Sequence, residues 1–367
     1  MFLAVITVGH VGTGNAGAMA LRHLIEDPRF ELTGVCVSTP AKVGRDAGEL
    51  AGIEARTGVA AVGDLDALIA TRPQVVFYAA IGETRFFEAV ADVQKLLEAG
   101  IHVVGTSPVT LLYPYGVLPD MMIDPLREAC EQHGVSLHVA GVDPGFANDV
   151  MPLVLASTCR TVHQVKCSEL ADYATYDGVA VMHDVMGFGQ PLDETPMLLK
   201  PGVLAAGWGV TMRQLAAGLG IELTEIREAY ERDPAPHDIE VSVGTIAQGT
   251  QAGLWFEVAG MVGEHKAIVV EHVTRTYEGQ RPDWASPGQE GGSYRVEITG
   301  EPSYTVEICP TSQDGDHNYA AILVGVGRAV NAIPAVVAAE PGIHTALDLP
   351  MNLAGTLTVP AATEEEN

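Results

Sequence analysis

The run Val11-Gly12-Thr13-Gly14-Asn15-Ala16-Gly17 decides the fold that this chain is expected to adopt. It follows the apolar residues Leu3-Ala4-Val5-Ile6-Thr7-Val8 and precedes a helix-like stretch from Ala18 to Glu26. A strand, a Gly-x-Gly-x-x-Gly turn and a helix in this order form a dinucleotide-binding fingerprint, in which the glycines permit the tight turn and the close approach of a pyrophosphate. The helix N-terminus adds free N–H groups for the phosphates. We therefore predict a nucleotide site at Gly12–Gly17; the alternative is an ordinary glycine turn, in a chain with 40 glycines.

Composition narrows the class of protein. The chain has 367 residues, enough for two domains, and a formal net charge of −27 from 20 Lys plus Arg and 47 Asp plus Glu. Such a surface repels nucleic acid and anionic membranes, so we expect neither as a partner; adaptation to salt would explain the charge equally well. The five cysteines show no metal-site spacing, so we expect no metal, and no basic leader precedes the first apolar run. A cytoplasmic enzyme is the default expectation.

The first part of the chain alternates strand-like and helix-like segments. Strand-like runs at 31–38, 74–80, 101–104 and 135–140, of which 74–80 is of the buried type, are separated by helical stretches at 64–70, 84–98 and 123–133. This alternation predicts an α/β domain with a doubly wound parallel (Rossmann) sheet over residues 1–148. A helical pattern at 318–333 predicts that residues 316–345 return to that domain.

The pattern changes after Asp149. Period-two runs at 162–170, 254–258, 267–273, 294–298 and 304–308 indicate long strands with one polar face, and helices are predicted at Val210–Leu219 and Leu223–Arg232. Residues 149–315 therefore form, by prediction, an α+β substrate and dimerisation domain with an open, largely antiparallel sheet. Because such a face often becomes an interface, we expect a homodimer.

The end of the second predicted strand bears on the cofactor. An NAD-binding chain usually carries Asp or Glu there for the ribose 2′-hydroxyl, but this chain has hydroxyls and cations instead: Ser38, Thr39, Lys42 and Arg45. Hydroxyl donors and cations suit a 2′-phosphate, so we predict NADP(H), with NAD(H) as the alternative. Lys42 and Arg45 would otherwise be solvated loop charges.

Ligands of open α/β sheets lie beyond the carboxyl ends of the strands. These positions predict further cofactor contacts at Ala79, Ala80, Ile81, Thr106, Ser107 and Asp143. Asp143 could equally form the turn before Pro144 or act as a general acid.

A dense polar group follows in the second domain. If the strand ends near Leu170, then Glu169, Tyr173 and Tyr176 lie on the loop that leaves it, facing a nicotinamide. Glu169 with Tyr173 could supply the acid–base group of a hydride transfer, and a carboxylate would also stabilise iminium or ammonium charge. The substrate pocket would then include Tyr176, His183, Met186 and Phe188. Alternatively, Glu169 is a surface strand residue, the two tyrosines serve only in packing, and the apolar residues belong to the core.

Several segments together resemble one known family: Gly12–Gly17, Ser38–Gly48, Leu111–Pro114, Gly141–Asp149, Met186–Gly189 and Arg328–Pro334. They resemble the dihydrodipicolinate-reductase-like oxidoreductases that include 2,4-diaminopentanoate dehydrogenase and the native amine dehydrogenases. The resemblance implies NAD(P)-dependent oxidative deamination of a small amine, or reductive amination of a ketone or aldehyde with ammonia. It also implies that Tyr173 and Tyr176 line the pocket and that Asn331 lies close to the cofactor.

Two departures from the family matter. The His-His-x-x-Lys segment of true dihydrodipicolinate reductases is absent, which argues against diaminopimelate synthesis. The glutamate that amine dehydrogenases carry after the fifth strand is also absent, because residues 106–114 (TSPVTLLYP) contain no carboxylate. Either another acid such as Glu169 takes over, or the protein is an NADPH-dependent reductase acting on C=O or C=C without ammonia, or a catalytically silent NADP(H)-binding protein.

Overall fold

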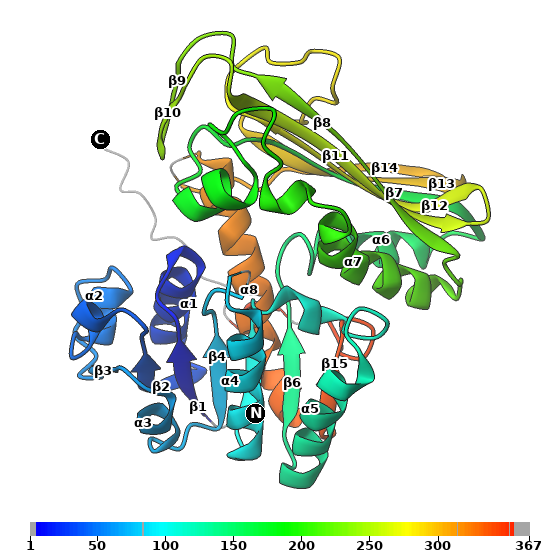
Figure 1. Cartoon of the computed structure of the whole chain (residues 1–367). Helices are drawn as coiled ribbons and strands as arrows, with labels where there is room; N and C mark the ends of the chain where they lie inside the picture. Colours follow the sequence, from blue (N-terminus) through cyan, green and yellow to red (C-terminus); the bar gives the residue numbers. More distant parts are fainter. Residues whose placement is uncertain (1–4, 83, 314, 352, 356–367) are drawn as a thin grey trace, which may run out of the picture.

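The chain folds around two β-sheets that face each other across a layer of helices (Figure 1). The computed structural model describes residues 5–82, 84–313, 315–351 and 353–355. Leu3 and Ala4 of the predicted first strand lie outside the described residues.

The first sheet has seven strands, all parallel to their neighbours. In spatial order these are β15 (Gly342–His344), β6 (Ser136–Val139), β5 (His102–Gly105), β4 (Val75–Tyr78), β1 (Ile6–Val11), β2 (Phe30–Cys36) and β3 (Ala61–Val62). The strands β4 to β6 are short and almost wholly buried, as expected for a parallel sheet covered on both faces. The predicted doubly wound Rossmann sheet is confirmed.

Helices cover both faces of this sheet. They are α1 (Asn15–Glu26), α2 (Ala47–Leu50), α3 (Leu65–Ile69), α4 (Phe86–Glu98), α5 (Asp120–His133) and α8 (His317–Ala338). Helix α1 packs beside α8, and α4 packs beside α5 (Figure 1). Each pair buries an apolar stripe against the sheet, forming two separate clusters of the core.

Helix α8 returns the chain from the second sheet to the first. It begins at the Asp316 side chain, which accepts a hydrogen bond from the N–H of Tyr319, and it continues through Pro334, beyond the predicted end at residue 333. By length and composition α8 is the one helix of the described chain that could cross a membrane. It instead packs against α1 and β5, and β15 after it joins the first sheet. The helix is therefore part of the core.

The second sheet is mixed and largely antiparallel, as predicted. In spatial order its strands are β14 (Tyr304–Ile308), β13 (Gly292–Glu301), β7 (Thr161–Asp172), β12 (His265–Arg275), β11 (Gln251–Val262) and β8 (Glu225–Pro234). Only the β7–β12 pair is parallel among these. Helices α6 (Val150–Ala156) and α7 (Val203–Leu219) pack on the face that looks toward the first sheet (Figure 1). Strands β9 (Ile239–Val241) and β10 (Gly244–Ile246) form a separate hairpin.

The helix predicted at Leu223–Arg232 is wrong. This segment is the edge strand β8, which pairs along nearly its whole length with β11. Its Glu and Arg residues have good helix propensity, but ladder hydrogen bonds to a long neighbouring strand outweigh so weak a preference. Helix α7 also begins earlier than predicted, at Val203 rather than Val210.

Candidate active site

The glycine turn has the geometry that a pyrophosphate needs. Gly12 has a φ of +93°, and a Cβ on it would lie 2.6 Å from the carbonyl oxygen of Ala79, so only glycine fits. A Cβ on Gly17 would clash with the carbonyl of Gly12. Gly14, in contrast, faces open space: no described atom lies within 4 Å of a Cβ placed there. Gly14 also precedes α1 without a side-chain cap, and the first turn of α1 has no acidic residue. The N–H of Gly12 donates to the carbonyl oxygen of Cys36, whereas the N–H groups at the start of α1 have no side-chain cap and can bind phosphate oxygens, so the residues fit a dinucleotide.

Two side chains bracket this turn. Lys42 donates hydrogen bonds from Nζ to the carbonyl oxygen of Thr13 at 2.7 Å and to its hydroxyl at 3.1 Å. Asn15, the first residue of α1, donates from Nδ2 to Asp177 Oδ1 at 2.5 Å and so connects the turn to the loop after β7. Ala16 follows in the first turn of α1.

The other residues predicted for the 2′-phosphate lie on the surface. Ser38 and Thr39 are exposed directly after β2, and Arg45 forms an exposed ion pair with Glu49 at 2.8 Å. Of the two predicted cations, only Lys42 contacts the glycine turn.

The further cofactor contacts predicted from the sequence lie at the carboxyl ends of β4 and β5. Ala79, Ala80 and Ile81 follow β4, and Ile81 is 46% exposed. Thr106 and Ser107 follow β5, where the buried Ser107 hydroxyl has no hydrogen-bond partner among the described residues. The structure brings these segments beside the glycine turn, because the N–H of Ala79 donates to the carbonyl oxygen of Val11.

Asn331 does not belong to this group. Its side-chain oxygen accepts a hydrogen bond of 2.7 Å from Arg29, which precedes β2 at the amino ends of the parallel strands. Six residues earlier on α8, Gly325 packs against Gly141, at the carboxyl end of β6. Since an α-helix advances about 1.5 Å per residue, Asn331 lies below the carboxyl edge. The expectation of a cofactor contact at Asn331 is thus corrected.

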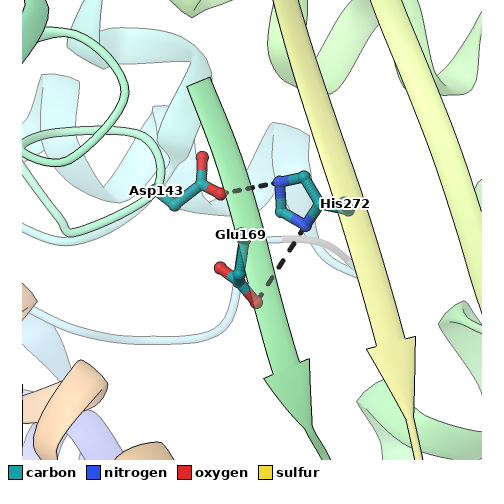
Figure 2. Close-up of side chains that lie close together, drawn as sticks. All are labelled: Asp143, Glu169 and His272. Atoms are coloured by element: carbon teal, nitrogen blue, oxygen red, sulfur yellow. Dashed lines mark ion pairs between the residues drawn. The ribbon is translucent and has the colours of Figure 1, made fainter. Parts of the chain in front are cut away.

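The second centre is a buried cluster of Asp143, Glu169 and His272 (Figure 2). Nε2 of His272 lies 2.6 Å from Asp143 Oδ2, and Nδ1 of His272 lies 4.0 Å from Glu169 Oε1. The side chains are between 2% and 9% exposed. This short contact becomes an ion pair when the His272 ring is protonated.

Sheet register assembles this cluster. Glu169 on β7 pairs with His272 on β12 and, on the other side, with Tyr294 on β13. Residues paired across strands share one face of the sheet, so the three side chains lie in a row. Asp143 comes from the loop after β6 and joins this row from the parallel sheet.

Aromatic side chains enclose the cluster and hold its orientation. Tyr173 donates a hydrogen bond of 2.6 Å to Glu169 Oε1, and Tyr294 lies beside Glu169 on the paired strand. Nε1 of Trp208 donates to Asp143 Oδ1 at 3.3 Å. The His272 ring stacks on Phe256, with ring centroids 4.5 Å apart. A low-dielectric shell of this kind strengthens charge interactions within it.

Electrostatics set the protonation states of the cluster. The pKa of Glu169 is raised to about 7: burial is the largest cause and Asp143 adds to it, whereas His272 and the Tyr173 hydroxyl oppose the shift. Burial would lower the pKa of His272, but the carboxylates of Asp143 and Glu169 outweigh it, and that pKa is raised. A carboxyl that titrates near neutral pH is suited to general acid–base work.

The strand β7 extends to Asp172, two residues beyond the predicted end. Glu169 is therefore a buried strand residue and not a loop residue, whereas Tyr173 and Tyr176 lie after the strand and stack, with ring centroids 4.9 Å apart. Tyr176 also lines a pocket of about 450 Å³ between α1, α8 and this loop, which Asn15 lines as well.

The remaining predicted pocket residues are dispersed. His183 lies on a π-helical turn, Ala180–Val185, and forms an exposed ion pair with Asp184. Met186 and Phe188 are buried in the core of the second sheet, the alternative that the sequence left open. These three residues do not contact Glu169 through any described interaction.

Sequence reasoning missed His272, Tyr294 and Trp208. His272 and Tyr294 lie in strands that were predicted, but their position beside Glu169 depends on strand pairing, which no local pattern specifies. The pair Glu271-His272 at the end of the apolar run Ala267–Val270 is a signal that could have drawn attention to His272.

Known proteins resemble this chain over most of its length. The family of the 2,4-diaminopentanoate dehydrogenase C-terminal domain matches residues 146–364. An amine dehydrogenase from Streptomyces virginiae is 41% identical over 343 residues, 93% of this chain and 95% of that protein. A 2,4-diaminopentanoate dehydrogenase from Acetoanaerobium sticklandii is 26% identical over 72% of this chain and 70% of that protein. The solved structure of an amine dehydrogenase from Mycobacterium smegmatis has a TM-score of 0.75 and 22% identity, and covers 95% of this chain and 97% of that one.

A parallel sheet with a pyrophosphate turn, opposed by a second sheet with a buried acid–base cluster, defines an NAD(P)-dependent oxidoreductase of the Rossmann type. Within that class, the chain belongs to the family of the amine dehydrogenases and 2,4-diaminopentanoate dehydrogenase, whose members act on CH–NH₂ groups and the corresponding carbonyls.

Proposed function

We propose that this protein is an NADP(H)-dependent amine dehydrogenase that interconverts a small amine with its ketone or aldehyde and ammonia. The observation that carries the proposal is the buried Glu169 carboxyl, held by Tyr173 at 2.6 Å beside His272 and Asp143. Two carboxylates in an enclosed site favour a cationic ligand, and an ammonium or iminium group is such a ligand.

Glu169 is the proposed catalytic base of deamination, with Tyr173 fixing its orientation. It accepts a proton from the substrate ammonium, which leaves a lone pair on nitrogen to form the C=N bond. When bound, the nicotinamide supplies the hydride acceptor. In the reverse direction Glu169 donates a proton to the leaving water. Its position on β7 offers a carboxyl where residues 106–114 after β5 have none.

The preference for NADP(H) over NAD(H) is part of this proposal. The end of β2 has no carboxylate to repel a 2′-phosphate, and Lys42 lies against the glycine turn through Thr13. We further propose, as expectations of the fold class, that the enzyme is a cytoplasmic homodimer that uses the second sheet as its interface.

A second candidate is a reductase acting on C=O or C=C without ammonia. The absence of a carboxylate in residues 106–114 favours it, since carbonyl reduction does not need that group. A silent NADP(H)-binding protein would have the same turn but no use for a carboxyl that titrates near neutral pH.

An NADPH-oxidation assay over small ketones and aldehydes, with and without ammonium chloride, separates these functions. We expect turnover that requires ammonium and saturates with it. Equal turnover without ammonium would support the carbonyl reductase, and NADPH binding without turnover would support the silent protein. A potassium chloride control at equal ionic strength excludes a salt effect on this acidic chain.

A further inference from the structure

Oxidative deamination requires more proton capacity than one carboxylate offers. The balanced reaction, which rests on the function proposed above, is R₂CH–NH₃⁺ + NADP⁺ + H₂O → R₂C=O + NH₄⁺ + NADPH + H⁺. The substrate ammonium loses one proton before the hydride leaves, and the attacking water loses another when it adds to the iminium carbon. Glu169 can hold only one of these two protons at a time.

A second basic group lies next to Glu169. His272 occupies the paired position on β12, its Nδ1 faces Glu169 and its Nε2 faces Asp143. The ring is fixed by the stack on Phe256 and by the edge of Trp208, whose centroid lies 4.8 Å away. An imidazolium at this point would be flanked by a carboxylate on each side, which stabilises the charged ring.

We propose that His272, held by Asp143, is the second proton site of the reaction and takes the first proton from Glu169, so that Glu169 is again a carboxylate when water adds. His272 contacts Glu169 rather than the substrate, so it is a positioning and proton-holding residue, not a catalytic one.

The steps balance as follows in the direction of deamination. The substrate N–H proton passes to Glu169 and then to Nδ1 of His272, which lies 4.0 Å from Oε1 and moves to hydrogen-bond distance for the transfer. The C–H bond then breaks, its electron pair leaves as hydride, and the nitrogen lone pair forms C=N. Water adds to carbon and gives a proton to Glu169. Glu169 returns that proton to the amine nitrogen, the C–N bond breaks with its pair on nitrogen, and the hydroxyl O–H pair forms C=O. The departing ammonia takes the hydroxyl proton, and the proton on His272 is the one released to solvent.

The charges around His272 support this assignment. Burial lowers its pKa, but Asp143 and Glu169 raise it more, and Glu271 next to it on β12 adds to the increase. The Glu271 carboxylate forms an ion pair with Lys166 at 2.9 Å on the other face of the sheet. Tyr173 and Tyr294 stay neutral, because burial first and the Glu169 charge second raise the pKa of each well above its ordinary value.

A divalent cation is the competing occupant of this cluster, because Asp, Glu and His are common ligands. One donor atom from each of the three side chains lies within 4.8 Å of the other two, so the test below must separate a bound cation from a proton.

The test is the pH dependence of kcat for amine oxidation in the full-length enzyme and in His272→Gln. With two groups that must be unprotonated, log kcat of the wild type rises at acidic pH with a limiting slope of about two, and the variant falls to a slope of about one with kcat reduced about 100-fold. His138→Gln, another buried histidine, contacts the carbonyl of His344 in the first sheet and should keep the wild-type slope. An unchanged slope in His272→Gln would overturn the proposal, as would a bound divalent cation that His272→Gln loses.

Asp143→Asn gives a second arm in case His272→Gln does not bind NADPH. Removing the Asp143 charge lowers the pKa of His272, so the acid limb should move to lower pH while both slopes remain. An acid limb at its wild-type position in Asp143→Asn would contradict the relay. Absence of ammonium-dependent turnover in the wild type would instead refute the proposed function itself.

Discussion

Nε2 of His272 lies 2.6 Å from Oδ2 of Asp143, and this contact joins the parallel sheet to the second sheet at the candidate active site. Asp143 follows β6 at the edge where a nicotinamide would bind, and His272 is paired with Glu169 on β7. The cluster is therefore built from both halves of the molecule, and in the proposed function nucleotide binding and proton transfer meet at this point.

The first prediction concerns the open side of the glycine turn. Gly14→Ala should leave the Tm of the free protein unchanged, because φ is −75° and nothing described lies within 4 Å of the added Cβ. The methyl group would occupy the space that a pyrophosphate approaches, so NADPH affinity should fall at least tenfold. Differential scanning fluorimetry and fluorescence titration measure the two quantities. Equal NADPH affinity would show that the phosphates bind elsewhere.

A second prediction concerns cofactor choice. Lys42→Ala should reduce kcat/KM for NADPH by about 10-fold to 100-fold, the range for loss of one charged hydrogen bond, with little change for NADH. Arg45→Ala is the matched control, since Arg45 pairs with exposed Glu49 and should have the smaller effect. A parallel loss with both cofactors would mean that Lys42 only supports the turn through Thr13.

The third prediction follows from Tyr173. Its hydroxyl stabilises the Glu169 carboxylate and lowers the pKa of that group. Tyr173→Phe should therefore raise the Glu169 pKa and move the acid limb of amine oxidation to higher pH. Tyr115→Phe, at a tyrosine that lies 37% exposed outside the cluster, should leave the limb in place. If the acid limb of the pH profile kept its position in Tyr173→Phe, Tyr173 would have no part in the acid–base step.

Asp149 gives a prediction about stability. Burial raises its pKa from 3.8 to about 7, partly opposed by the Val150 N–H and reinforced by Asp143. The folded state thus holds a proton that the unfolded state has lost between these values, so this group lowers stability as the pH rises from about 4 to about 7. Asp149→Asn removes the titration and keeps the Oδ1 acceptor for Val150. The Tm of Asp149→Asn minus that of the wild type should therefore be higher at pH 8 than at pH 5.

The control for Asp149→Asn is Asp193→Asn, an exposed carboxyl. It should give the same Tm difference at both values of pH. If Asp149→Asn behaved in the same way, Asp149 would be ionised in the folded protein throughout this range.

Local sequence patterns predict the parallel sheet, the glycine turn and the contact between Glu169 and Tyr173, because each of these features depends on residues close together in the chain. They failed where distant strands decide the outcome. The local pattern of the β8 segment predicts a helix, but pairing with β11 makes it a strand. His272 is a neighbour of Glu169 only because of the register of β12 against β7. The family resemblance implies that Asn331 lies close to the cofactor. In the structure Asn331 contacts Arg29 instead, because its turn of α8 lies below the carboxyl edge of the sheet.

The most direct test of the central claim is kcat for ammonium-dependent NADPH oxidation in wild type, Glu169→Gln and Glu297→Gln. Glu297 is a half-buried carboxyl on the neighbouring strand β13 and serves as the matched control. We predict ammonium-dependent turnover in the wild type and in Glu297→Gln, and a loss of about 100-fold or more in Glu169→Gln with NADPH affinity unchanged. Wild-type kcat in Glu169→Gln would contradict the assignment of Glu169 as the acid–base group.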